Sequence, residues 1–260
     1  MKTKSFYVNT KTIKIIAVIS MVFDHVAFIL PGHNYYALPY AIFHGIGRIS
    51  APLFFYLLAV GYKHSSNLNR YSLRLLIFAL LSVYPYVLFK YDGDFANNYL
   101  QLNVLFTMFF GLQFLRVIHS HRKPIIKIPL LVIIAVIMLF CDEGWFGLAV
   151  VVISDALMDD RKKFAGGFLA LTLLYFYSNL GMAIGDSGNF IKLYSSFSSM
   201  SNFLSIFVWF CYFLPFLIIL RDENFYKKTQ PYKKPNVLEK YAFYAFYPLH
   251  LIVLSLIKIM

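Results

Sequence analysis

Nine apolar stretches, each long enough or nearly long enough to cross a bilayer, follow one another along this chain of 260 residues. A transmembrane helix needs about 20 mainly apolar residues. The longest polar gaps, 183–202 and 221–240, are too short for a soluble domain. The sequence therefore predicts an all-α polytopic membrane helical bundle that forms one domain over residues 1–260. Its nine expected transmembrane helices lie at 13–30, 46–62, 73–89, 100–118, 125–140, 144–158, 165–182, 203–220 and 241–259.

The composition excludes an ordinary soluble protein. Hydrophobic residues make up 60% of the chain and charged residues 14%, whereas a soluble domain carries about 25% charged residues. The net charge of +12 would suggest nucleic acid in a soluble chain, but the basic residues lie between the apolar stretches, so we expect no nucleic-acid partner. Cys141 and Cys211 have no CxxC or metal-ligand spacing, and the sequence predicts no metal site and no disulfide framework.

The basic residues also indicate the orientation of the chain. Lys and Arg favour the cytoplasmic ends of membrane helices. With nine spans and a cytoplasmic N-terminus, 20 of the 24 lysines and arginines fall on the cytoplasmic side; the other four are Arg48, Lys90, Lys192 and Lys258. We therefore expect a multi-pass protein of the bacterial inner membrane, with the first stretch retained as a span and the C-terminus outside.

Two polar side chains lie near the middle of the first predicted span. Asp24 and His25 follow Ile13 by 11–12 residues, which places them about 17 Å into a hydrocarbon core of about 30 Å. A histidine can accept a proton from a nucleophile at neutral pH, and a nearby carboxylate can stabilise the imidazolium. A structural ion pair or a proton-transport site would explain the two residues as well. A further acid, Asp155, makes 144–158 the weakest span.

The last predicted span places a second histidine at a similar depth. Tyr247 and His250 are three residues apart and therefore share one face of a helix. In the predicted topology both helices run from inside to outside, so these side chains lie in the layer of Asp24 and His25. We expect Tyr247 and His250 to line the same cavity, although a helix kinked at Pro248 would explain them structurally.

Arg48 lies towards the outer face, about 10 Å outside the layer of Asp24. Its side chain could pair with Asp24, bind an anionic group, or extend to the membrane interface. The neighbouring Gly45, Gly47 and Pro52 indicate close packing and a bend.

Two more polar features mark the outer ends of spans. Asn103 is an isolated amide where a span begins. Asp142, Glu143 and Trp145 form an acidic, aromatic turn, in which the aromatic belt of the interface alone would explain Trp145.

Basic groups on the inner side could hold the phosphates of a cytosolic ligand such as coenzyme A. The positive-inside bias explains these residues without any ligand, so both interpretations stay open. The candidates are Lys63, Arg70, Arg74 and Arg116. The chain has no Walker loop, GxSxG elbow, GxGxxG or HExxH motif, which argues against hydrolases, kinases and dinucleotide enzymes of familiar design.

Six segments taken together resemble the TraX family. In chain order they read KIIAVISMVFDH, IGRISAPLFFYLLAVGYKHS, RYSLRLLIFALLSVYPYVL, LNVLFT, DEGWFG and YAFYAFYPLHL. The segments extend over nearly the whole chain, which makes the single domain a TraX-like one. The gaps 183–202 and 221–240 depart from the family pattern, so the resemblance does not transfer the acceptor.

This resemblance implies a transmembrane acetyltransferase. TraX proteins are named for the N-acetylation of F-type pilin, and they are similar to membrane acyltransferases that use an intramembrane histidine. By this resemblance His25 is the catalytic residue and Asp24 its partner, while Arg48 or Asn103 stabilises the oxyanion or positions the acceptor. The expected co-substrate is cytosolic acetyl-CoA, and no metal is implied.

The acceptor implied by the resemblance is an amine or hydroxyl at the outer face, such as the N-terminus of a pilin-like protein or a glycan. Two other functions stay open. A proton-coupled transporter of small solutes would use the intramembrane Asp24 and His25 equally well. A non-catalytic assembly factor for a surface structure would not need His25.

Overall fold

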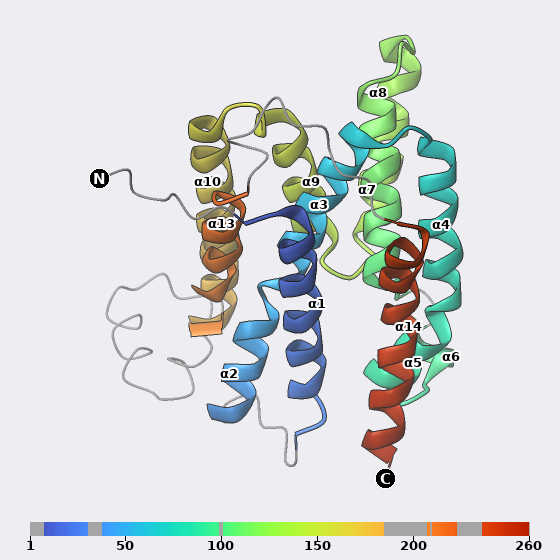
Figure 1. Cartoon of the computed structure of the whole chain (residues 1–260), viewed down its shortest axis with the longest axis vertical. Coiled ribbons are helices and arrows are strands. Elements are labelled where there is room, and N and C mark those ends of the chain that lie inside the picture. The colour runs from blue at the N-terminus through green and yellow to red at the C-terminus, as the bar shows by residue number, and fades with distance from the viewer. Residues whose placement is uncertain are drawn as a thin grey trace. The chain divides into compact units, whose positions relative to one another are not determined.

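The computed structural model is helical over the residues that it describes, which are 8–30, 38–98, 101–184, 207–208, 210–222 and 236–259 (Figure 1). In this part of the chain, β-structure is limited to the isolated bridges Val8–Asp222 and Leu102–Cys141. The helices are α1 (Thr10–Ala27), α2 (Leu38–Gly47), α3 (Ser50–His64), α4 (Leu68–Leu81), α5 (Val83–Lys90), α6 (Phe95–Asn98), α7 (Val104–Ile118), α8 (Pro124–Met138), α9 (Gly144–Leu157), α10 (Arg161–Ile184), the 3₁₀ helix η1 (Cys211–Phe213), α13 (Leu214–Ile219) and α14 (Val237–Ile259).

The all-helical class is confirmed over the described residues, but the number of nine spans is not. Two helices there are long and apolar enough to cross a membrane, namely Leu38–His64 (α2 and α3 together) and Tyr241–Ile259. A third joins them if the bent pair α4–α5 is one span. The apolar helices α7, α8 and α9 have only 14 to 15 residues. Most of the gaps 183–202 and 221–240, and part of the expected span 203–220, lie outside the described residues.

The chain divides into two compact units. Unit 1 comprises Met1–Phe54 and Ala156–Lys228, and unit 2 comprises Phe55–Asp155 and Thr229–Met260. The expectation of a single domain over 1–260 stays a prediction.

In unit 1, α1 packs along α2, and η1 contacts both α2 and α10. Asp160 precedes α10 and accepts the backbone N–H groups of Lys163 at 3.3 Å and Lys162 at 3.0 Å. These hydrogen bonds satisfy donors that the first helical turn leaves open. They also hold the pKa of Asp160 below its usual range.

In unit 2, α4 packs against α7, α7 against α8, and α14 against both α4 and α5 (Figure 1). One face of α8 exposes large apolar side chains to the surroundings. Such a face is costly in water and is typical of a helix that contacts lipid. Its members are Ile125, Ile126, Ile128, Val132, Ile133 and Val136.

Two interruptions of long helices have identifiable causes. Between α2 and α3, Pro52 has no N–H for the carbonyl of Arg48 four residues earlier, and the helix breaks at Arg48 and Ile49. The bend of 44° between α4 and α5 lies at Ser82. Pro85 removes a backbone donor there, and the Ser82 hydroxyl donates to the Phe78 carbonyl oxygen at 2.6 Å. Near Pro52, where the sequence predicted a bend, the helix is interrupted at Arg48 and Ile49, although α2 and α3 together still form one candidate span.

Candidate functional site

Helices α1 and α2 lie in close contact at Gly47. A Cβ atom at this position would overlap the backbone and Cβ of Asp24. The absence of a side chain lets the two backbones come together, as small residues do between membrane helices. The close packing predicted for the Gly45–Gly47 pair is confirmed, and it brings Asp24 of α1 to the end of α2.

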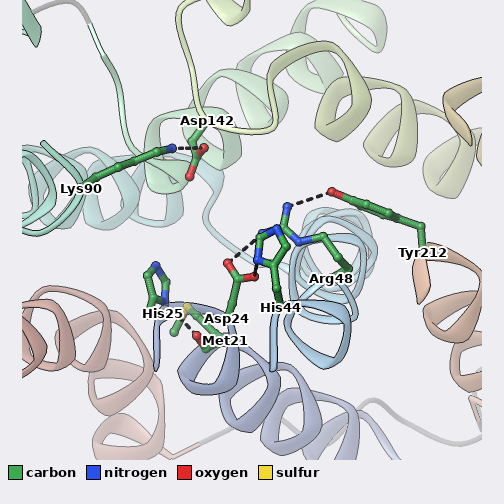
Figure 2. Close-up of polar contacts among 8 residues, drawn as sticks. All are labelled: Met21, Asp24, His25, His44, Arg48, Lys90, Asp142 and Tyr212. Atoms are coloured by element: carbon green, nitrogen blue, oxygen red, sulfur yellow. Dashed lines mark hydrogen bonds and ion pairs between the residues drawn. The ribbon is translucent and has the colours of Figure 1, made fainter. Parts of the chain in front are cut away.

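The carboxylate of Asp24 faces two cationic or potentially cationic groups (Figure 2). Nη2 of Arg48 lies 2.7 Å from one carboxylate oxygen and 2.8 Å from the other. Nδ1 of His44 lies 2.9 Å from Oδ1, in a close contact that lacks ideal hydrogen-bond alignment. The three side chains are only 15–17% exposed. Because burying a lone carboxylate is very costly, these partners allow the charge of Asp24 to persist inside the helix pair.

His44 is a site residue that the sequence did not reveal. It lies four residues before Arg48, so both project from the same face towards Asp24. Phe28 and Tyr40 hold its ring, with centroid distances of 5.5 and 5.0 Å. The HGIGR segment contains the four-residue spacing between His44 and Arg48. The predicted span began at residue 46, however, so His44 was not included among the candidates.

Arg48 has a second partner that comes from far along the chain. Nη1 donates to the Tyr212 hydroxyl at 2.9 Å, and the guanidinium carbon lies 5.7 Å from the centre of the Tyr212 ring. Tyr212 belongs to η1 and is only 1% exposed. Of the three roles open to Arg48 from the sequence, pairing with Asp24 is the one observed. No sequence signal pointed to Tyr212.

His25 projects from α1 beside this cluster, as Figure 2 shows. Its Nδ1 lies 2.8 Å from the Met21 carbonyl oxygen. A carbonyl only accepts, so Nδ1 carries the hydrogen and the neutral ring has its lone pair on Nε2. His25 is close enough to Asp24 and His44 for its charge to act on both. The direct polar contacts of Asp24 are with Arg48 and His44, so the predicted Asp24–His25 partnership is electrostatic.

In unit 2, the pair predicted on α14 shares one face. The ring centres of Tyr247 and His250 lie 5.5 Å apart. Both residues are buried, with exposed fractions of 3% and 8%. Nδ1 of His250 lies 2.9 Å from the Phe246 carbonyl oxygen, which leaves the lone pair of the neutral ring on Nε2, as in His25. Whether these residues line a cavity with His25 stays a prediction.

Asn103 has a structural explanation. Its side-chain oxygen accepts the N–H of Leu105 at 3.1 Å and thereby caps α7. Its side-chain nitrogen donates to the Ala79 carbonyl oxygen of α4 at 2.9 Å. The residue is fully buried, and both ends of the amide serve packing and capping.

Among the basic residues proposed for phosphate binding, all in unit 2, Lys63 lies at the end of α3, Arg70 in the first turn of α4, Arg74 in the middle of α4 and Arg116 near the end of α7. Arg116 contacts Gln113 at 3.1 Å and Asn69 at 2.6 Å, which brings the end of α7 to the start of α4. Arg74 lies 5.8 Å from the centre of the Tyr71 ring. Lys63 and Arg70 are exposed. Arg74 and Arg116 are half-buried, and Arg116 is held by neutral polar partners.

Asp155 is explained by a contact that the sequence did not predict. Its carboxylate lies 2.7 Å from Nε2 of His119, at the end of α7. Tyr62 stacks on the His119 ring at 5.5 Å. Asp155, which made 144–158 the weakest predicted span, is thus paired with His119. In the described part of the chain, no group of three or more His, Cys, Asp or Glu side chains is placed to hold a metal.

Comparisons with known proteins agree with the resemblance read from the sequence. The family described as TraX protein matches residues 9–258. The chain is also similar to a protein of Dichelobacter nodosus described as probable fimbrial assembly protein FimC, serogroup H1. The two are 26% identical over 251 residues, which cover 95% of this chain and 94% of that protein. No solved structure shows a significant match. Because the family match extends over nearly the whole chain, the protein belongs to the TraX family.

Proposed function

We propose that this protein is a multi-pass inner-membrane acetyltransferase that moves an acetyl group from cytosolic acetyl-CoA to an amine or hydroxyl acceptor at the outer face. The observation that carries the proposal is the buried Asp24–His44–Arg48 cluster with His25 beside it. Ionised groups inside a membrane helix pair are expensive and usually functional. TraX membership and the apolar helices support the same conclusion.

In this proposal His25 is the general base. Its Nε2 takes the proton of the acceptor amine or hydroxyl while the acceptor nitrogen or oxygen attacks the thioester carbon. The carbon–sulfur bond then breaks, and the imidazolium returns the proton to the CoA thiolate. The products are the acetylated acceptor and free CoA. The bond from Nδ1 to Met21 supports this role because it directs the lone pair to Nε2.

Arg48 and its partners supply the electrostatics. Negative charge develops on the thioester oxygen during attack, and a fixed guanidinium stabilises such charge strongly in a dry site. Asp24 and Tyr212 hold Arg48 through hydrogen bonds of 2.7 to 2.9 Å. His44 is a positioning residue that steadies Asp24. The acetyl group would reach the centre from CoA whose phosphates bind Lys63, Arg70, Arg74 or Arg116.

The descriptions of the relative and of the family support one class of acceptor. The relative in Dichelobacter nodosus is described as a fimbrial assembly protein, and TraX is named for pilin acetylation. These names support a surface-fibre subunit as the acceptor, with its N-terminus or an attached glycan as the acetylated group. The predicted topology, with the N-terminus inside and nine spans, would let the acceptor enter from the outside.

The proposal is tested with purified protein, radiolabelled acetyl-CoA, and glycinamide or glucosamine as acceptor. The wild type should form labelled product, and His25→Ala should lose it. His121→Ala is the matched control, because His121 is exposed and lies outside the proposed site; it should act like the wild type. Full transfer by a folded His25→Ala protein would refute the role of His25. Proton-linked solute flux without acetyl transfer would favour the transporter instead.

A further inference from the structure

A second polar cluster lies within unit 2 and is formed by other residues than Asp24 and Arg48. Nζ of Lys90 donates to Oδ1 of Asp142 at 3.0 Å (Figure 2). It also donates to the Tyr86 hydroxyl at 3.0 Å. The Lys90 and Asp142 side chains are 36% and 31% exposed. A ligand can therefore reach this ion pair, which the proposed acetyl transfer does not use.

The backbone around Asp142 is fixed by several contacts. The Asp142 N–H donates to the Leu102 carbonyl oxygen at 2.8 Å, and the Leu102 N–H donates to the Phe140 carbonyl oxygen at 3.0 Å. The Thr107 hydroxyl donates to the Asp142 carbonyl oxygen. Glu143, the next residue, has a φ of 59°, a conformation that non-glycine residues adopt rarely. The Asp142 carboxylate is thus held in place before any ligand arrives.

Tyr247 adds a buried group that points to a ligand. It is 3% exposed, and its hydroxyl has no hydrogen-bond partner among the described residues. The oxygen lies within electrostatic reach of Asp142, Lys90 and Tyr86. The Val104 N–H faces the same oxygen outside hydrogen-bond geometry, but as a donor it cannot accept the hydroxyl hydrogen. A buried hydroxyl without a partner is energetically costly, and a bound acceptor atom would remove that cost.

The carboxylate of Asp142 can accept further hydrogen bonds. Lys90 contacts Oδ1, whereas Oδ2 has no hydrogen bond within the described chain. A carboxylate oxygen only accepts, so the complementary ligand group is a donor, and an ammonium gives the strongest such bond. A neighbouring oxygen on the ligand would satisfy Tyr247 and the remaining donor capacity of Lys90.

We propose that Asp142, Lys90 and Tyr247 form a binding site for a primary ammonium group with an adjacent carbonyl oxygen. The ammonium donates to Oδ2 of Asp142, and the carbonyl accepts from the Tyr247 hydroxyl and Nζ of Lys90. This inference rests on the proposed function in one respect: a molecule that binds here as the ammonium would first lose one proton to water and then serve as the amine acceptor, so the site would select an amine acceptor over a hydroxyl acceptor.

Two matched probes test the site on the full-length protein in nanodiscs without acetyl-CoA. Glycinamide carries the ammonium and the carbonyl, and glycolamide replaces the amine with a hydroxyl. Titration monitored by ligand-observed NMR should show tighter binding of glycinamide by about tenfold or more, because a charge-assisted bond is lost in glycolamide. Asp142→Asn should remove this preference. Asp159→Asn, an exposed acid elsewhere in the chain, should retain it.

Tyr247→Phe keeps the shape of the side chain and provides a second variant if Asp142→Asn does not fold. It should weaken both probes about equally, by several fold, since it removes only the bond to the carbonyl. The site is refuted if the wild type binds neither probe, or if glycinamide binds Asp142→Asn or Tyr247→Phe as it binds the wild type.

Acetyl transfer, measured separately, distinguishes the two proposals. Selective binding without transfer by the wild type would refute the acetyltransferase and keep the site. Transfer to glycinamide with an unchanged KM in Asp142→Asn would refute the site and keep the enzyme.

Discussion

Arg48 and Asp24 form the strongest charge pair in the candidate site, and each depends on the other. Arg48→Met would leave the Asp24 carboxylate with only His44 as a direct partner in a position that is 15% exposed. Losing one partner of a buried pair costs about 3–5 kcal/mol. We expect this loss in the unfolding free energy of Arg48→Met in detergent, measured by chemical denaturation.

The double variant Asp24→Asn/Arg48→Met is the control for this prediction. It removes both charges and should recover much of the lost stability, because no uncompensated charge remains. Equal stability of Arg48→Met and the wild type would show that the pair does not hold α1 and α2 together.

The two histidines near Asp24 should respond differently to substitution. His25→Ala removes the proposed base, and added imidazole should restore part of the transfer rate. His44→Gln removes only a positioning contact, so kcat should fall about 10- to 100-fold with little change in KM. Steady-state kinetics on both variants check this. Imidazole rescue of His44→Gln and not of His25→Ala would exchange the two roles.

At the scale of single residues, the sequence predicted that Asp24 and Arg48 belong to the site. It left open whether the two side chains pair. It did not predict that Asp24 contacts His44 directly. Adjacent positions on a helix diverge by about 100°, so the side chains of Asp24 and His25 must face different neighbours. The Tyr212 contact with Arg48 joins positions 164 residues apart, and only the packed structure reveals such a contact.

The approach of α1 and α2 depends on Gly47. Gly47→Ala would place a Cβ against the backbone of Asp24, so the helices must separate and the Asp24–Arg48 contact should weaken. We expect a lower melting temperature and reduced acetyl transfer. Gly166→Ala is the matched control, because nothing lies within 4 Å of the added Cβ. Alanine there should be neutral or stabilising by up to about 1 kcal/mol. Identical melting of the two variants would contradict the close approach.

The cap of α7 gives a second prediction for an element. Asn103→Ala removes a buried cap and the bond to Ala79, and should cost about 2 kcal/mol of unfolding free energy. Asn67→Ala removes only the exposed cap of α4, which accepts the Arg70 N–H at 2.9 Å, and should cost about 1 kcal/mol. If Asn103→Ala loses transfer but no stability, Asn103 acts on the substrate and not on the fold.

Helix positions were the part of the fold most open to prediction. The apolar stretches at 73–89 and 125–140 correspond to α4–α5 and α8. The stretch at 46–62 missed α2, because Leu38–Gly47 is shorter than a span and contains His44. Its continuation into α3 depends on the backbone at Arg48 and Ile49, which hydropathy does not describe.

For the whole molecule, we expect the N-terminus inside and nine spans. In a protein with Cys141 and Cys211 replaced by serine, Ala96→Cys and Lys123→Cys each place a thiol at an exposed position. A membrane-impermeant maleimide should label Ala96→Cys on intact spheroplasts and Lys123→Cys only after lysis. The reverse pattern would invert the topology, and equal labelling would place both positions on one side.

The helical class that the sequence predicted is confirmed over the described residues, whereas the number of spans is not yet confirmed. The excess of apolar residues dictates helices, since the bilayer requires every backbone group to be bonded internally. The count of nine stays a prediction, because α7, α8 and α9 have 14 to 15 residues, fewer than the roughly 20 of a full span. The family was predicted because its motifs extend over nearly the whole chain.

The central claim is that acetyl groups cross from one face of the membrane to the other. Proteoliposomes with glycinamide and glucosamine trapped inside and radiolabelled acetyl-CoA added outside test it directly. We predict that the wild type accumulates labelled, acetylated acceptor inside the vesicles and that His25→Ala does not. No labelled product inside, or product formed only when acetyl-CoA and acceptor share one side, would contradict the account.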